Sequence, residues 1–170
     1  MSRIVPLQDA LKRTRPFRSP AQETGLSLMR ASDALRRRLT EVVAPHGITM
    51  QQYNVLRILR GAGADGLPTL AVGERMIERT PGVTRLLDRL EADGLVARHR
   101  CDQDRRRVFA RITERGLALL GRIDDPLASA EDSVFEGFEA DELRGLIREL
   151  ERVRAALEFD GDEDGDGATA

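Results

Sequence analysis

Hydrophobic positions recur at helical spacing along most of the chain. The first long stripe follows Pro20 and comprises Leu28, Leu35, Leu39 and Val42, separated by seven, four and three residues. Pro45 and Gly47 are expected to end that helix. A last helix is predicted from about Asp141 to Glu158, with a stripe of Leu143, Leu146, Ile147, Leu150, Val153 and Leu157. The chain therefore begins and ends its ordered part with long amphipathic helices.

Two shorter helices are predicted after the first one. Thr49 and Gln52 form a capping-box pattern at the start of a helix that turns Tyr53, Leu56 and Leu59 inward. That helix is expected to stop in the glycine-rich stretch 61–66. The next is expected to start at Pro68 or Thr69 and to include Leu70, Met76 and Ile77.

The stretch from residue 80 to residue 113 is the most informative one. Thr80 is expected to cap a helix and Pro81 to occupy its first position, where a missing amide proton costs no hydrogen bond. One face of this helix is apolar and the other is polar, the two sets being Val83, Leu86, Leu87 and Leu90 against Thr84, Arg85, Asp88 and Arg89. Gly94 suits the left-handed position after the helix. Two short strands, LVARHR and VFARIT, then flank a polar loop from Cys101 to Arg107.

The remaining segments complete the fold class. Thr113 is expected to cap a helix that Pro126 kinks or interrupts. Residues 1–19 are predicted to be a flexible extension with one short helical turn, and residues 159–170 a disordered acidic tail. Three helices followed by a two-stranded hairpin predict a mainly α protein with a small β-hairpin wing, that is, a winged helix-turn-helix with additional helices at both ends.

Composition excludes several classes of protein. The chain has 170 residues, a single cysteine and two histidines, so neither an internal disulfide nor an ordinary structural zinc site is expected. No apolar run approaches the ~20 residues that span a bilayer, and the N-terminus lacks the apolar centre of a signal peptide, so a cytoplasmic protein without membrane contact is expected. Motifs for nucleophilic, phosphate-binding or metallopeptidase chemistry are missing, which predicts a non-enzyme without a cofactor. Asp160, Asp162 and Asp164 match the opening of a calcium loop, but the chain ends before its essential glutamate.

Charge is distributed unevenly. Residues 1–115 carry 22 Lys or Arg against 13 Asp or Glu, whereas residues 116–170 carry 5 against 16. This asymmetry favours an anionic partner that contacts the first part of the chain only. Thr80, Thr84 and Arg85 are candidates for contacts with base edges in the major groove of double-stranded DNA, and Arg89 for a phosphate contact. The three adjacent arginines 105–107 suit a narrow minor groove.

Each of these candidate residues also has a simpler interpretation as an ordinary structural or surface residue. Arg105–Arg107 are also compatible with a solvated hairpin tip, and Arg85 and Arg89 with ion pairs to Asp88 at helical spacing. His46 and His99 suit structural or surface roles. Cys101 is read as an incidental thiol, with oxidation as the alternative.

The segments TRLLDRLEADGLVAR, DQDRRRV and ITERG resemble the MarR family of bacterial transcription regulators, and the likeness extends over about residues 22–158. It implies that Asp104 orients a wing arginine and that Arg105 or Arg106 enters the minor groove. It also implies that the chain forms a homodimer through residues 20–47 and 114–158, with residues 48–113 as the DNA-binding region. A symmetric dimer would place its two recognition helices about one turn of DNA apart, ~34–36 Å, so a pseudo-palindromic operator is expected.

The resemblance further implies repression that a small, often phenolic anion relieves. Such a ligand would bind between the dimerisation and DNA-binding regions, where His46, Met50, Tyr53 and Arg57 are candidates by location. The chain has no Trp for a urate-type site, and Cys101 is not in the first helix, where peroxide sensors of the family carry theirs. The alternatives are a ligand-independent regulator and a winged-helix module that binds proteins.

Overall fold

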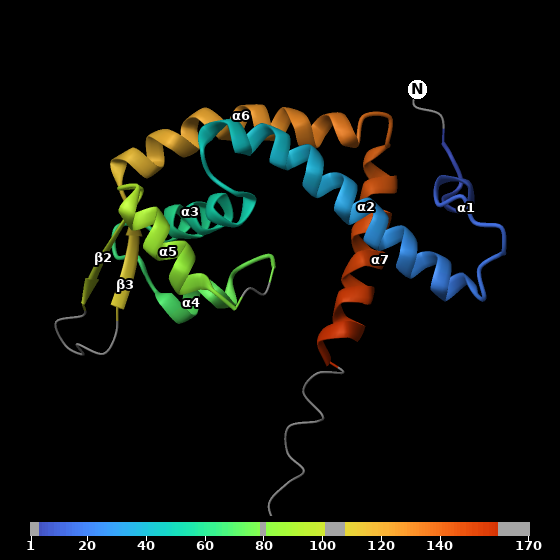
Figure 1. Cartoon of the computed structure of the whole chain (residues 1–170), viewed down its shortest axis with the longest axis horizontal. Coiled ribbons are helices and arrows are strands. Elements are labelled where there is room, and N and C mark those ends of the chain that lie inside the picture. The colour runs from blue at the N-terminus through green and yellow to red at the C-terminus, as the bar shows by residue number, and fades with distance from the viewer. Residues whose placement is uncertain (1–3, 79–80, 101–107, 160–170) are drawn as a thin grey trace, which may run out of the picture. The chain divides into compact units, whose positions relative to one another are not determined.

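The first long helix, α2, spans Pro20–Val43 as the hydrophobic stripe predicted. The Ser19 hydroxyl accepts a hydrogen bond from the Gln22 amide (3.2 Å), which caps its N-terminus. A 3-10 turn, η1 (Ala44–His46), follows, and Gly47 ends it with a left-handed φ of 78°. This computed structural model describes residues 4–78, 81–100 and 108–159. In it, α2 lies beside α6 (Glu114–Val134; Figure 1).

Helix α3 (Met50–Ala62) forms the centre of the core. Its capping box is present in both directions, because Thr49 and Gln52 each bond the other's backbone amide. Tyr53, Leu56 and Leu59 are buried as predicted. They pack in one cluster with residues from α2, α4, α5, the sheet and α6, so α3 connects these elements through the core.

The next two helices differ from the prediction at their ends. Helix α4 spans Thr69–Glu74, so Met76 and Ile77 lie beyond it, in the turn. Helix α5 spans Val83–Ala92 with Gly82 at the N-cap, so Pro81 precedes the helix and the expected cap at Thr80 is wrong. At the end of α4 the Arg75 and Met76 amides donate to the Val72 and Gly73 carbonyl oxygens, three residues back, so the helix closes in a tighter turn that leads into residues 76–78.

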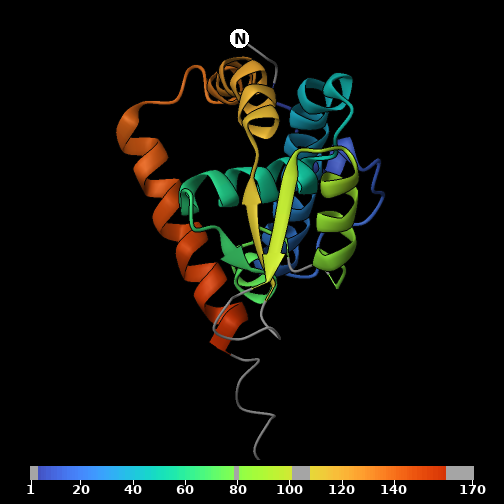
Figure 2. The same cartoon turned by 90° about the vertical axis from the view of Figure 1, so that its left-hand side faces the viewer.

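A three-stranded antiparallel sheet replaces the predicted two-stranded hairpin. Strands β2 (Val96–Arg100) and β3 (Val108–Ile112) were expected, and β1 (Leu67–Pro68) adds to the other edge of β3 in the order β1-β3-β2. Figure 2 shows β2 and β3 side by side, with α3 behind them and α5 at their flank. A two-residue strand carries no alternation, so hydrophobic periodicity had no means of revealing it.

Helix α6 spans Glu114–Val134. The Gly116 amide donates to the Thr113 hydroxyl (3.1 Å), so the predicted cap is confirmed. Pro126 lies inside the helix without interrupting it. Its ring is exposed, so water can satisfy the carbonyl that loses its hydrogen bond.

Backbone contacts divide the chain into two units, one of residues 3–134 and one that contains α7 (Ala140–Phe159). The predicted stripe is present on α7, but Leu146, Ile147, Leu150, Val153 and Leu157 are 37–73% exposed. A short helix, α1 (Leu7–Ala10), lies in the N-terminal extension, as predicted. None of the helices in the described part of the chain has the length and apolar character needed to span a bilayer.

Candidate nucleic-acid interface and adjoining cavity

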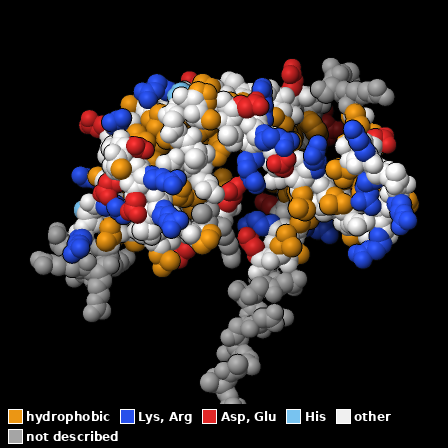
Figure 3. Space-filling model, viewed as in Figure 1, with side chains coloured by type: hydrophobic (Ala, Val, Ile, Leu, Met, Phe, Trp, Pro, Cys, Tyr) orange, Lys and Arg blue, Asp and Glu red, His pale blue; other side chains and the backbone are white. Residues whose placement is uncertain are grey.

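Helix α5 presents a basic face outward. Leu86, Leu87 and Leu90 are buried, which fixes the helix's rotation and exposes Thr84, Arg85 and Arg89, as predicted. Basic side chains are visible over α5 in the space-filling view (Figure 3). Neither Arg85 nor Arg89 forms an ion pair with any residue that the structure describes, and Asp88 pairs elsewhere. Both guanidinium groups therefore remain available to an external anion.

The N-terminus of α5 is also open. Its N-cap is Gly82, and no side chain caps the helix. The first amide protons of a helix have no partner within the helix, and they attract phosphate oxygens. The start of α5 and the Arg85 side chain thus offer donors at the same end of the helix.

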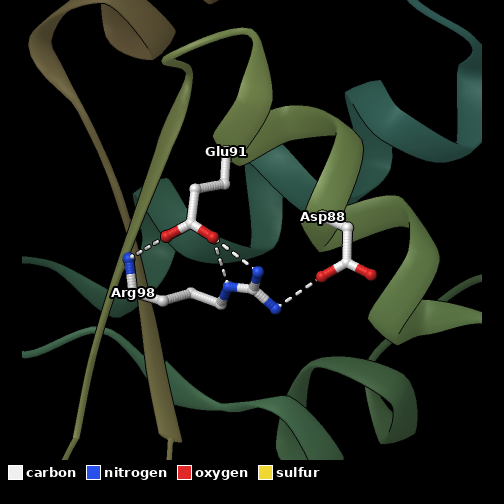
Figure 4. A network of polar contacts seen from close by, with 3 residues as sticks. All are labelled: Asp88, Glu91 and Arg98. Carbon is white, nitrogen blue, oxygen red and sulfur yellow. Dashed lines mark hydrogen bonds and ion pairs between the residues drawn. The ribbon is translucent and has the colours of Figure 1, made fainter.

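An ion-pair network ties α5 to the wing (Figure 4). The Arg98 guanidinium on β2 donates from Nε (2.7 Å) and Nη2 (2.5 Å) to Glu91, and its Nη1 lies 2.7 Å from Asp88 Oδ1. The Arg98 backbone amide donates to the other oxygen of Glu91 (3.1 Å). Hydrogen bonds from Arg98 lower the pKa of Glu91. Arg98 therefore connects the predicted recognition helix directly to the strand that leads into the wing.

Sequence reasoning did not identify Arg98 as a functional residue. The available signal was the spacing of Asp88 and Glu91, which places two carboxylates one turn apart on α5. An arginine on the following strand is then within reach of both. In the sequence alone, Asp88 suggests only an alternative ion-pair partner for Arg85 and Arg89, which are first of all candidates for DNA contacts.

The tip of the wing lies outside the described residues. That tip includes Cys101 and the predicted DNA contacts Asp104, Arg105, Arg106 and Arg107, and Thr80 lies outside as well. The strands that lead to it are described, and the rings of His99 and Phe109 stack across them at 5.7 Å. His99 thus has the surface role expected of it.

A cavity of about 420 Å³ lies between α2, α3, α6 and the turn that connects α4 to α5. Three of the four predicted ligand residues, Met50, Tyr53 and Arg57, line it, whereas His46 does not. Its wall comes from α2, α3, α6 and the turn after α4. The lining residues are Ser32, Leu35, Arg36, Leu39, Met50, Gln51, Tyr53, Asn54, Arg57, Met76, Ile77, Glu78, Leu127 and Glu131.

The polar side chains in and beside the cavity differ in their hydrogen-bond and ion-pair partners. The Tyr53 hydroxyl donates to Asp124 Oδ1 (3.0 Å), and burial, reinforced by that carboxylate, raises the pKa of Tyr53 to about 12. Arg60 pairs with Asp124 and lowers the pKa of that carboxyl group. Arg57 lies 5.9 Å from the centre of the Tyr53 ring and makes no ion pair within the described ranges. Among the residues that the structure places, no cluster of His, Cys, Asp or Glu is arranged to hold a metal ion.

Comparisons with known proteins agree with this geometry. The family model described as MarR family matches residues 48–108. The HTH-type transcriptional regulator FarR of Neisseria gonorrhoeae is 30% identical over 145 residues, covering 84% of this chain and 98% of FarR. The homoprotocatechuate degradative operon repressor of Escherichia coli is 29% identical over 130 residues, covering 76% and 86%. The crystal structure of NadR in complex with 4-hydroxyphenylacetate aligns with a TM-score of 0.65 at 27% identity, covering 82% and 97%.

These relatives are named as regulators rather than enzymes, and the alignments with them cover 84% and 76% of this chain. The order of elements, the basic outward face of α5 and the sequence identity lead to the same assignment. The chain belongs to the MarR family of transcriptional regulators.

Proposed function

We propose that the protein is a sequence-specific regulator that binds double-stranded DNA as a homodimer and acts in the cytoplasm. The observation that carries this proposal is the outward face of α5, where Arg85 and Arg89 are exposed without an ion pair to any described residue. Two exposed guanidinium groups that make no intramolecular ion pair on one short helix suit contacts with the base edges and phosphates of a major groove.

The residues of α5 have separate roles in this proposal. Thr84 and Arg85 lie in its first turns and contact base edges, and Arg89, farther along, contacts a phosphate. Thr80 and the wing residues 104–107 keep the roles that the family resemblance implies: Asp104 orients the wing, and Arg105 or Arg106 enters the minor groove, with Arg107 nearby.

The proposed homodimer follows from α7. Five of the six residues of its apolar stripe are 37–73% exposed within the chain, and a stripe of this length is stabilised when a second chain covers it. Residues 20–47 and 114–158 are the proposed dimerisation segments. A two-fold dimer would present two α5 helices to a pseudo-palindromic operator.

We further propose that a small aromatic carboxylate binds the cavity and releases the protein from its operator, so that the protein acts as a repressor. A volume of about 420 Å³ lies in the range of small-molecule sites. The cavity combines an apolar wall with Arg57, which is free to bind a carboxylate. NadR has been crystallised with 4-hydroxyphenylacetate, and one relative is named for a homoprotocatechuate operon, which supports an aromatic acid as the ligand class.

Binding to DNA is tested with duplexes selected from a random pool by the full-length protein. We expect Arg85→Ala to lose ~1–3 kcal/mol and to relax the preference at one base pair. Arg89→Ala should weaken all duplexes equally and reduce the salt dependence of binding by about one phosphate. Arg15→Ala, which removes an exposed arginine of the N-terminal extension that forms no ion pair with a described residue, is the matched control.

Two results would count against DNA binding through α5, and a third would count against the proposed ligand. An affinity that does not depend on salt would exclude phosphate contacts and favour a module that binds protein. Equal behaviour of Arg85→Ala and Arg15→Ala would show that α5 does not read the duplex. A repressor that responds to no aromatic acid would leave the ligand-independent alternative.

A further inference from the structure

Glu78 lies in the turn between α4 and α5 and is held by side chains from two other helices. Its Oε1 lies 3.0 Å from Arg36 Nε on α2, and its Oε2 accepts a hydrogen bond from Gln51 Nε2 on α3 (3.1 Å). All three side chains line the cavity. The turn that leads into the proposed recognition helix is therefore bound to α2 through a contact in the cavity wall.

The neighbouring residue shows that polar contacts hold this part of the turn. The Ile77 amide donates to Asn54 Oδ1 on α3 over a long 3.4 Å, while the Ile77 side chain is 86% exposed. Met76 is the buried anchor at the preceding position. Residues 77 and 78 thus have little apolar burial, and the position of the turn depends on the groups that Glu78 and Ile77 contact.

An anion in the cavity would meet two arginines, of which one already forms an ion pair and the other does not. Arg57 has no ion pair with a described residue, whereas Arg36 is already paired with the carboxylate of Glu78. A ligand carboxylate carries the same charge and the same pair of acceptor oxygens as Glu78. It therefore competes with Glu78 for Arg36, and a ligand that takes Arg36 leaves Glu78 without this partner.

We propose that the Arg36–Glu78 ion pair is the contact through which a carboxylate ligand acts on the DNA-binding turn. The inference rests on the proposed function, since it gives the cavity's ligand a route to α5. In the ligand-free protein, Glu78 holds the turn against α2. In the liganded protein, the ligand carboxylate occupies Arg36, and the turn and α5 lose one of their connections to α2.

The strength of the pair suits a contact that a ligand can replace. Its side chains are 55% and 41% exposed, and exposed ion pairs of this kind change an equilibrium constant by about 1.5- to 5-fold. A much stronger pair would exclude the ligand from Arg36. By linkage, a ligand that opens the pair and weakens DNA binding must itself bind more weakly to the DNA-bound protein.

The experiment uses full-length protein, a selected operator duplex, benzoate as the anionic probe and benzamide as its neutral counterpart. Glu78→Gln removes the competing charge. Glu131→Gln removes another carboxylate of the same cavity, one that makes no ion pair with a described residue, and it is the matched control. Affinity for benzoate is measured by calorimetry, and affinity for the operator is measured with and without saturating benzoate.

Both variants are expected to bind benzoate more tightly, because each removes a negative charge from the cavity. Only Glu78→Gln should also bind the operator about 1.5- to 5-fold more weakly without ligand and show a smaller effect of benzoate on operator binding. Arg36→Gln should bind benzoate more weakly than wild type, and benzamide affinity should not change in Glu78→Gln.

The two proposals fail in different ways. If wild type binds benzoate and releases the operator, but Glu78→Gln matches Glu131→Gln in operator affinity and in the benzoate effect, the ion pair is not the connection and the proposed function stands. If wild type binds the operator but not benzoate, the proposed ligand class fails and the ion-pair mechanism fails with it.

Discussion

Arg98 provides the most direct test of how the wing is held against α5. We consider Arg98→Met, because methionine keeps an unbranched apolar stem of similar length while removing the guanidinium group. The substitution removes two hydrogen bonds to Glu91 and the contact with Asp88. It leaves two carboxylates on α5 without their shared cation.

The expected loss of stability follows from the exposure of these groups. Arg98 is 24% exposed and Asp88 is 52% exposed, so the network lies between a buried pair and a surface pair. Charge-assisted hydrogen bonds contribute ~1.5–3 kcal/mol when shielded and exposed ion pairs ~0.2–1 kcal/mol, and we expect about 1–2 kcal/mol for the whole network. Arg98→Lys should lose an intermediate amount, since it keeps the charge but not the planar fork.

The assay is urea unfolding at one fixed protein concentration, because unfolding of a dimer depends on concentration. Arg37→Met is the control, because Arg37 forms an exposed pair with Asp33 one turn away on α2 (2.5 Å). Pairs of that type contribute ~0.3–0.5 kcal/mol. Operator affinity should fall in Arg98→Met and not in Arg37→Met. Equal losses of stability in both, with wild-type operator affinity, would refute the idea that this network orients the wing.

Two further tests concern the packing and charge of α6. A Cβ at Gly116 would lie 2.4 Å from the Leu95 carbonyl oxygen, so Gly116→Ala should destabilise the protein by ~1–3 kcal/mol. A Cβ at Gly121 would meet nothing within 4 Å, so Gly121→Ala should stabilise the protein by up to ~1 kcal/mol. A melting temperature that shifts in the same direction in both variants would contradict this reasoning. Arg60 lowers the pKa of Asp124, so the stability that this carboxylate contributes is present above the ordinary carboxyl pKa and is lost as the pH falls through the lowered value. Wild type should therefore exceed Asp124→Asn in stability at pH ~7 and lose that advantage toward pH ~2; a difference that does not depend on pH would exclude the ion pair as its source.

Local rules predicted much of the fold. The capping box of α3 involves residues three positions apart, so the pattern alone was enough to locate the start of the helix. The same applies to the cap of α6 at Thr113 and to the apolar face of α5. These features depend either on contacts between residues one helix turn apart or on the 3.6-residue period of a helix, and both can be recognised in the sequence.

Contacts between distant segments limited the prediction. Helix α4 ends at Glu74, before Met76 and Ile77, which its hydrophobic pattern included, and the two-residue strand β1 exists only because β3 lies beside it. Neither outcome is encoded in a repeating pattern. The expected cap at Thr80 was wrong as well, since α5 begins at Val83 with Gly82 at its N-cap.

By itself, the sequence determined the helical order, the short hairpin, the exposed arginines of α5 and the resemblance to a family of regulators. The tertiary structure decided which charged groups meet: Arg98 with Asp88 and Glu91, and Arg36 with Glu78 across the cavity. The physical reason is that an ion pair acts over a few ångströms in space. Arg36 and Glu78 are 42 positions apart in the chain, and only the packing of α2 and the turn after α4 onto α3 brings them within reach of each other.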